Sequence, residues 1–231
     1  MSLSVGVNNK TLCSGSSSMT SSSLTIASGS GIIIGLIYDN PSPNFSSISD
    51  SRSSANITLI GAGETTFGTN AGRGRWYYLP TVTSGSGYQV TVNFSGAMFC
   101  TLFVAEVTTT NGSGITIDQN NVGNDATSPF TSPSITTTIA NEILWGLTGE
   151  DGASGTYNHT AGNSFTLLLE ETTGGTNWCS SLQYRVVSST GSYNTSTTVS
   201  PGSPTDTADW IASFSETASA QSSLTWVGYI G

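Results

Sequence analysis

The chain has 231 residues, of which 8% are charged, and its 14 acidic and five basic side chains give a formal net charge of −9. This length is sufficient for one domain with a sizeable core. So few basic residues cannot form the positive surface that binds phosphates, which argues against a nucleic-acid partner and an anionic membrane surface. The basic residues are Lys10, Arg52, Arg73, Arg75 and Arg185.

The N-terminal segment, residues 1–22, is rich in serine and poor in apolar residues. We therefore expect an N-terminal arm rather than a core strand. The segment has no apolar stretch of the kind found in secretory signals, so we expect the protein to be made and kept in a cytoplasm. No apolar run approaches the roughly 18 residues of a membrane helix.

The central part of the chain reads as a series of short strands separated by turns. Residues 32–38 are continuously apolar, which indicates a strand covered on both faces. Residues 88–94 alternate between apolar and polar, which predicts one buried and one wet face. Residues 98–107 are apolar on both faces and predict a central strand. Further strands are predicted at 24–27, 46–60, 76–79, 115–117, 135–139, 143–147, 164–170, 182–186 and 210–214.

This spacing, without an amphipathic helix pattern, predicts an all-β protein. We expect an antiparallel β-sandwich that is jelly-roll-like, formed as one domain by residues 23–220. The predicted core consists of Ile34, Leu36, Val90, Val92, Phe94, Leu102, Val104, Leu144, Phe165, Leu167, Tyr184, Val186, Trp210 and Phe214.

The C-terminal tail, residues 221–231, is apolar and follows the last predicted core strand. An apolar terminus left in water promotes aggregation, so we expect it to dock. It either folds back as an edge strand or adds to a neighbouring subunit of a symmetric oligomer, with a trimer as the first choice. The residues expected to mediate self-assembly are Leu224, Trp226, Val227, Tyr229 and Ile230.

The densest group of oxygen ligands lies in residues 118–125, which read DQNNVGND. Calcium prefers carboxylate and amide oxygens, so Asp118, Asn120, Asn121 and Asp125 form a candidate calcium loop. The segment lacks the terminal glutamate of an EF-hand. The same side chains also stabilise loops without a metal, and no other cofactor is predicted.

Candidate catalytic residues are sparse. His159 is the only histidine, and no nucleophile elbow is present, so we expect an exposed histidine in a turn. Glu170 and Glu171 are neighbours on a predicted strand and should point to opposite faces, which does not suit a glycosidase pair. The remaining candidate acids, expected to be solvated, are Glu106, Glu142 and Glu150. The sequence therefore argues against an enzyme.

The cysteines and aromatic residues have mainly structural interpretations. Cys13, Cys100 and Cys179 are too few for a disulfide framework or a zinc site, so we expect buried thiols. A bridge between Cys100 and Cys179 is the alternative. Trp178 lies in a predicted turn and is the best candidate for a glycan contact. Core positions are expected for Trp76, Tyr77, Tyr78, Trp145 and Trp210.

A resemblance is carried by the order of segments between residues 32 and 214. They are SSISDS (46–51), RWYYLPTVTSGSGYQVTVNFSG (75–96), TLFVAEV (101–107), IDQNNVGNDATSPFTSPSITTTIANEILWG (117–146), NSFTLLLEET (163–172) and DWIASF (209–214). This order resembles a β-jelly-roll family found in phage virion proteins and bacterial extracellular proteins. The resemblance implies a virion surface or a cell-surface appendage, and the family has no shared active site to transfer.

Two functional hypotheses follow. The first is a non-enzymatic virion structural protein, a phage capsid decoration or head-fibre protein on the outer surface, which would assemble in the host cytoplasm. Its partners would be the major capsid protein or other virion proteins, and further copies of itself. The second is a carbohydrate-binding, lectin-like module of a phage tail, a receptor-binding protein or a bacterial surface adhesin.

Overall fold

The computed structural model describes residues 3–38, 44–52, 56–61, 63–68, 72–151, 156–172, 178–201 and 206–218. These residues form strands and connecting segments without a helix, and every strand pairing is antiparallel. This confirms the predicted all-β antiparallel sandwich. The strands are β1 (Ser4–Thr20), β2 (Leu24–Ile26), β3 (Gly31–Tyr38), β4 (Phe45–Asp50), β5 (Thr58–Leu59), β6 (Thr65–Phe67), β7 (Gly72–Leu79), β8 (Gly85–Tyr88), β9 (Val90–Thr108), β10 (Ile115–Asp125), β11 (Phe130–Thr131), β12 (Ile135–Thr136), β13 (Glu142–Asp151), β14 (Asn158–Ala161), β15 (Thr166–Glu171), β16 (Trp178–Val187), β17 (Ser192–Tyr193), β18 (Ser196–Ser200) and β19 (Asp206–Glu216).

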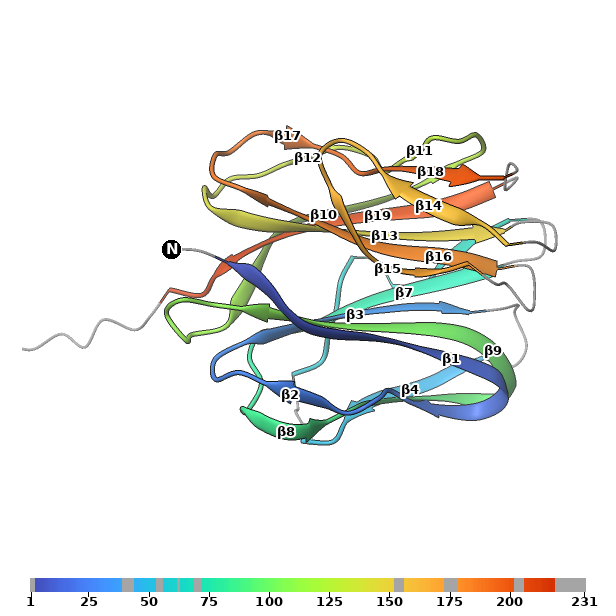
Figure 1. Cartoon of the computed structure of the whole chain (residues 1–231), viewed down its shortest axis with the longest axis horizontal. Coiled ribbons are helices and arrows are strands. Elements are labelled where there is room, and N and C mark those ends of the chain that lie inside the picture. The colour runs from blue at the N-terminus through green and yellow to red at the C-terminus, as the bar shows by residue number, and fades with distance from the viewer. Residues whose placement is uncertain are drawn as a thin grey trace, which may run out of the picture.

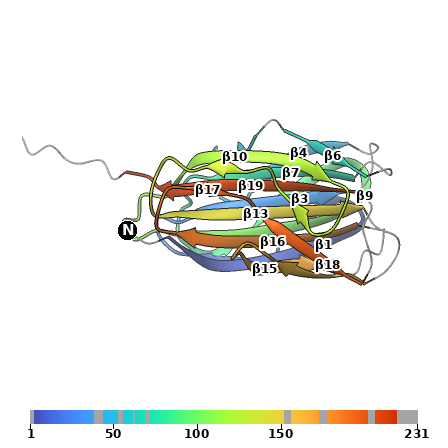
Figure 2. The same ribbon diagram turned by 90° about the horizontal axis from the view of Figure 1, so that it is seen from above.

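The strands are stacked in layers (Figure 1). A seven-stranded sheet has the order β1-β9-β3-β7-β5, with β4 added to β9 and β6 to β7. It faces a five-stranded sheet of order β10-β19-β13-β16-β15, whose strands lie side by side in Figure 2. The outer face of the five-stranded sheet is covered by a three-stranded sheet, β11-β18-β14, and by the β12–β17 pair. The β2–β8 pair and β4 lie on the opposite side of the molecule.

The longest strand, β9, joins two strands that the sequence predicts separately, at 88–94 and 98–107. Its first part pairs with β4 and its second part with β3. The neighbouring β1 shows register shifts between Ser14 and Ser18, opposite this change of partner. Bulges of this kind bend a strand, so β1 and β9 curve together from one layer into the next, as Figure 1 shows.

Three layers of apolar side chains hold the stack together. The central core, between the two large sheets, contains Trp76, Phe103, Trp145, Trp210 and Phe214. The lower core, on the other face of the seven-stranded sheet, contains Ile32, Ile34, Leu36, Tyr88 and Val92. The outer core, on the far face of the five-stranded sheet, contains Leu144, Phe165, Ile211, Phe130 and Val199. Both faces of β3 are therefore buried, as its continuous apolar sequence predicts.

The expectation of an N-terminal arm is wrong. Residues 4–20 form β1, which pairs with β9 from Ser4↔Thr108 to Thr20↔Thr91. Cys13 and Met19 are buried, whereas most of the serines face outward. An edge strand needs few apolar residues when its partner supplies the backbone hydrogen bonds, and such long-range pairing leaves little trace in local composition.

Most of the predicted core is confirmed, with exceptions on two neighbouring strands. Leu167 on β15 and Tyr184 on β16 are half-buried, and the prediction for Val186 is wrong because it is 50% exposed. A register shift between Leu167 and Leu169 breaks the strict alternation of β15. The confirmed buried residues are Ile34, Leu36, Val90, Val92, Phe94, Leu102, Val104, Leu144, Phe165, Trp210 and Phe214.

The apolar tail, residues 221–231, lies outside the described residues, and with it the predicted assembly residues Leu224, Trp226, Val227, Tyr229 and Ile230. Within the described part of the chain, no helix has the length and hydropathy needed to cross a membrane.

Candidate functional site

The outward face of the five-stranded sheet carries a row of buried polar side chains. On β13, Trp145 and Leu147 face the central core, so alternation turns Thr148 and Glu150 to the other face. On β19, Trp210 likewise faces the central core and Asp209 the other side. These three polar residues are 0% exposed because the three-stranded sheet covers them. The polar row therefore lies between two layers of the fold.

At one end of this row, Glu150, His159 and Glu170 form an acid–histidine cluster. His159 lies on β14, and its Nε2 is 3.0 Å from Oε1 of Glu150 on β13. Its Nδ1 is 3.1 Å from Oε2 of Glu170 on β15, and the same Oε2 accepts a 2.9 Å hydrogen bond from the His159 backbone N–H. The cluster thus joins three strands through one imidazole.

The electrostatics of the cluster favour a protonated imidazole. Burial alone would lower the pKa of His159, but hydrogen bonds and charge from Glu150 and then Glu170 outweigh it, so this pKa lies above its ordinary value. The side chains of His159 and Glu150 are 0% exposed, whereas that of Glu170 is 32% exposed. When both ring nitrogens carry protons, the Nδ1 proton is donated to Glu170 and the Nε2 side of the charged ring lies beside Glu150.

Next to this cluster, Asp209 is the centre of a threonine–aspartate network. Its Oδ1 accepts a hydrogen bond from Thr148 at 2.9 Å, and its Oδ2 accepts one from Thr207 at 2.8 Å. Thr148 also lies 3.1 Å from the hydroxyl of Thr197 on β18, which accepts a 3.0 Å bond from Nε2 of Gln183. This network ties the five-stranded sheet to the three-stranded sheet that covers it.

The carboxyl group of Asp209 has an unusual acidity. Its burial raises its pKa to about 7 against the hydrogen bonds from Thr207 and Thr148, and the nearby charges of Glu150 and Asp125 act in the same direction as burial. A carboxyl group with this pKa is partly protonated near neutral pH, which reduces the repulsion among the acids of this row.

The charged groups of this cluster interact with one another inside the fold. General acid–base catalysis requires a catalytic group within hydrogen-bond reach of a substrate, and His159 and Glu150 have no exposed side-chain surface. The expected exposed turn histidine is wrong, because β14 pairs with β18 and turns His159 inward. The sequence holds a signal for this, since Tyr157, His159 and Ala161 alternate with polar residues as in a half-buried strand.

The other candidate acids are also buried rather than solvated. Glu106 accepts hydrogen bonds from the backbone N–H groups of Val7 and Ala27, at 3.1 and 2.7 Å. Glu171 forms a 2.8 Å ion pair with Lys10 of β1, on the opposite side of β15 from the His159 contact of Glu170.

Glu142 is 0% exposed, and its burial, followed by the charge of Asp118, raises its pKa to about 7. With Glu106 and Glu171 it shows that the expectation of solvated acids is wrong. These carboxyl groups instead accept hydrogen bonds, form an ion pair or repel a neighbouring carboxylate inside the fold.

The four residues of the candidate calcium loop lie on β10, a strand rather than a loop. Oδ2 of Asp118 accepts a 2.6 Å hydrogen bond from Thr138 N–H, and Oδ2 of Asp125 accepts a 3.2 Å bond from Thr131 N–H. At a strand rise of about 3.3 Å per residue these two carboxylates are about 23 Å apart along the strand, and Asn120 and Asn121 between them point to opposite faces.

The structure does not bring these four residues together around one point. Within the described ranges, no group of three or more histidine, cysteine, aspartate or glutamate side chains could hold a metal ion.

An arginine–aromatic cluster lies on the seven-stranded sheet, partly exposed to solvent. Glu64 accepts hydrogen bonds from Arg73, Tyr38 and Arg75, the last at 3.2 Å from both its Nε and Nη2. Burial would raise the pKa of Glu64, but the Tyr38 hydrogen bond and the two arginines lower it further than burial raises it. The Arg75 guanidinium lies 4.3 Å from the centre of the Phe45 ring.

Sequence reasoning missed this cluster. The available signal was the strand segment Arg73-Gly-Arg75-Trp-Tyr77, in which two arginines and a tyrosine share one face of β7.

Of the residues with predicted aromatic roles, Trp76, Tyr77, Tyr78, Trp145 and Trp210 are buried, as expected. Trp178 begins β16, but its side chain lies outside the described residues, as does Trp226.

Cys13, Cys100 and Cys179 are buried and form no disulfide bond with one another, as expected. Cys100 lies in the lower core and Cys179 in the outer core, so the alternative bridge between these two is wrong.

Comparison with known proteins identifies no family for this chain. No family model matches the chain, and no curated protein or solved structure matches it significantly. The function is therefore argued from the residues of the fold and from the resemblance in the order of its segments.

Proposed function

We propose that this chain is a non-enzymatic structural protein of a phage virion, a capsid decoration or head-fibre protein on the outer surface. The observation that carries the proposal is that its buried polar side chains join the layers of the fold. The acid–histidine cluster and the threonine–aspartate network bind one sheet layer to the next, and the side chains of His159 and Glu150 have no exposed surface. A layered fold with such internal cross-links suits a rigid building block.

The surface chemistry supports an outer position. A protein that lines packaged DNA is expected to be basic, whereas this chain has a net charge of −9. Its partners are proposed to be the major capsid protein or other virion proteins, and further copies of itself, with a trimer as the first choice. Assembly in the host cytoplasm and a final location on the virion surface belong to the same proposal.

The proposal is tested by mass spectrometry of intact virions that carry the gene for this chain. A copy number that matches the repeating lattice of the capsid supports a decoration protein, and a few copies per particle support a fibre or tail location. Absence of the chain from purified particles contradicts the proposal. Deletion of residues 221–231 should abolish attachment to particles while leaving the melting temperature unchanged, if the tail docks on a neighbour.

A carbohydrate-binding module is the second candidate, and the arginine–aromatic cluster is the observation that favours it. Sugar sites combine aromatic rings with charged hydrogen-bonding side chains, and Phe45, Arg75 and Glu64 supply both in a partly exposed position. The test is a glycan array with the wild-type chain and with Arg75→Ala. Binding that the substitution abolishes supports this candidate, and an array without signal contradicts it.

A further inference from the structure

Two cysteines from opposite parts of the described chain face one another in the lower core. Cys13 on β1 is directly opposite Cys100 on β9 in the antiparallel pairing of these strands. Directly opposite residues project from the same face of a sheet. Each of the two residues is 7% exposed, and both belong to the lower core.

The spacing of this pair suits a disulfide. Directly opposite residues in an antiparallel pair have Cα atoms about 4.5 or 5.5 Å apart. Disulfide bonds span Cα distances of roughly 4.4–6.8 Å, so this pairing lies within the range that a bridge can span. Cys179 lies in the outer core with Phe130 and Val199, beyond two sheets, and cannot compete for either thiol.

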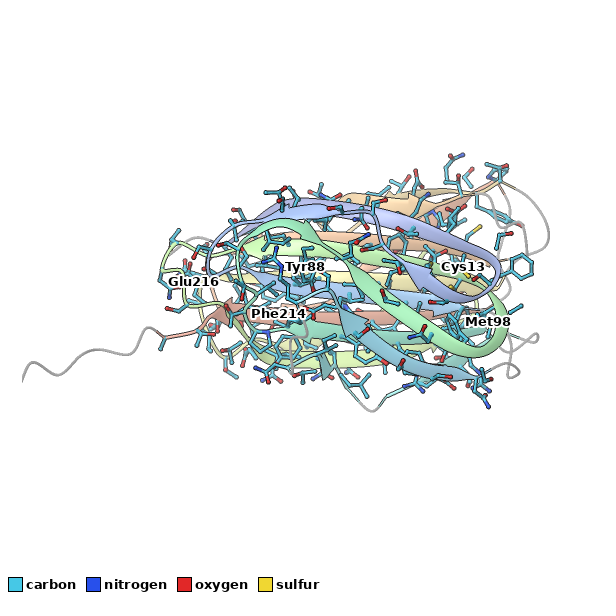
Figure 3. All side chains as sticks on the ribbon, turned by 90° about the horizontal axis from the view of Figure 1, so that it is seen from below. Cys13, Tyr88, Met98, Phe214 and Glu216 are labelled. Carbon is cyan, nitrogen blue, oxygen red and sulfur yellow. The ribbon has the colours of Figure 1, made fainter. Side chains whose placement is uncertain are left out.

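The surroundings of the two thiols limit their reactivity in the closed fold. The Cys13 thiol lies 3.2 Å from the carbonyl oxygen of Met98 and 3.3 Å from that of Ser16, and Cys100 Sγ lies 3.8 Å from Met19 Sδ. Figure 3 shows Cys13 and Met98 at the same end of the molecule. Burial and the neighbouring Cys13 raise the pKa of the Cys100 thiol, so Cys100 offers little thiolate to an oxidant in the folded protein.

We propose that Cys13 and Cys100 are a redox modification site, which closes to an intramolecular disulfide when a small-molecule disulfide such as oxidised glutathione reaches the opened edge of β1. One protein thiolate attacks the glutathione disulfide, forming a mixed disulfide and releasing one reduced glutathione. The second protein thiolate then attacks the protein sulfur of the mixed disulfide and releases the other. The two protons lost by the protein thiols pass to the departing glutathione thiolates, so that two protein thiols are oxidised and one glutathione disulfide is reduced to two thiols.

The bridge would lock the N-terminal strand onto the fold. Among the described strands of its sheet, β1 pairs with β9 alone, and register shifts begin after Ser14, one residue beyond Cys13. A covalent link at this point closes a long chain loop and prevents β1 from separating. This inference does not depend on the proposed virion role, since it concerns the isolated chain.

The test uses the purified full-length protein, incubated with oxidised and reduced glutathione in urea well below its unfolding midpoint. The protein is then denatured, alkylated with iodoacetamide and weighed. We expect a protein that has lost two hydrogens and gained one alkyl group, at Cys179 alone, and a peptide that links the Cys13 and Cys100 segments. The melting temperature should rise by about 10 °C and return to its original value with a reductant.

Matched variants separate the pair from the third cysteine. Cys179→Ala should still form the bridge, whereas Cys13→Ala and Cys100→Ala should not. Three alkylated cysteines in the wild-type protein, a lasting glutathione adduct, or a bridge through Cys179 overturns the proposal. These readings come from the wild-type chain and hold even if a variant fails to fold. A bridge that leaves the melting temperature unchanged overturns the locking of β1.

Discussion

At the scale of single residues, His159 illustrates how a polar side chain becomes part of a core. Its imidazole contacts Glu150 and Glu170 from different strands, and its own strand supplies a further N–H to Glu170. A buried carboxylate without a partner costs several kcal/mol, so the two acids and the imidazole depend on one another. His159 therefore stabilises the fold mainly because it keeps Glu150 from being buried without a partner, and less through the attraction of the ion pair itself.

Replacement of His159 by alanine should lower the free energy of unfolding by about 3–5 kcal/mol, because Glu150 would remain buried without its partner. The measurement is urea unfolding monitored by circular dichroism at pH 6. Thr160→Ala is the matched control, since Thr160 is the exposed neighbour on β14 and should change stability by less than about 0.5 kcal/mol. Equal effects of the two substitutions would show that the cluster does not stabilise the fold.

Asp209 permits a substitution that is expected to stabilise the protein at alkaline pH. Its folded pKa of about 7 lies above the ordinary value of 3.8, so the folded state disfavours the charged form. Asp209→Asn removes that charge with little change in shape and should raise the free energy of unfolding at pH 8 by on the order of 2 kcal/mol. At pH 5 the gain should be smaller, and it should disappear below about pH 4. Urea midpoints at the two pH values provide the measurement, and a loss of stability at pH 8 would contradict it.

At the scale of strands, local patterns predicted those elements whose burial follows a simple period. Val90, Val92 and Phe94 alternate with half-buried polar residues as the sequence indicates. The strand β1 was missed because its order comes from pairing with β9, far along the chain, and its own residues are mostly polar. The acid–histidine cluster was missed for a related reason, since three separate strands create it.

Substitutions can measure how a register shift changes the contribution of a strand residue to stability. Val92→Ala should cost about 2–3 kcal/mol, because Val92 is 0% exposed and leaves a cavity in the lower core. Leu167→Ala should cost about 1 kcal/mol, because the register shift in β15 leaves Leu167 half-buried. Val186→Ala is the control at 50% exposure and should change stability by less than about 0.5 kcal/mol. A larger loss for Leu167 than for Val92 would contradict the observed registers.

At the scale of the whole molecule, the buried titratable groups act together on stability. The pKa values of Asp209 and Glu142 are raised to about 7, so their folded states bind protons that the unfolded chain has already released between about pH 4 and 7. Stability from these groups is present below their unfolded pKa and is lost as pH rises towards 7. The pKa of His159 is also raised, and its contribution is lost as pH rises further through that folded value.

Other groups determine where stability is lost as pH falls. The pKa values of Glu64 and Asp118 are lowered, because arginines and Tyr38 stabilise the first carboxylate and hydrogen bonds from Thr138 stabilise the second. Their contribution is present above their unfolded pKa values and is lost as pH falls below about 4. A net charge of −9 near neutral pH adds self-repulsion, which weakens as pH approaches the isoelectric point of about 4.1.

The balance predicts a stability maximum near pH 5, and a lower urea midpoint at pH 8 than at pH 5. The measurement is a series of urea unfolding curves from pH 4 to 9 at constant ionic strength. Because Asp209 and Glu142 carry most of the decline below pH 7, the double variant Asp209→Asn with Glu142→Gln should flatten the curve between pH 5 and 7. It should leave the further loss that His159 contributes as pH rises through its raised pKa. A wild-type midpoint that rises from pH 5 to pH 8 would show that these buried groups do not govern the stability of the layered fold.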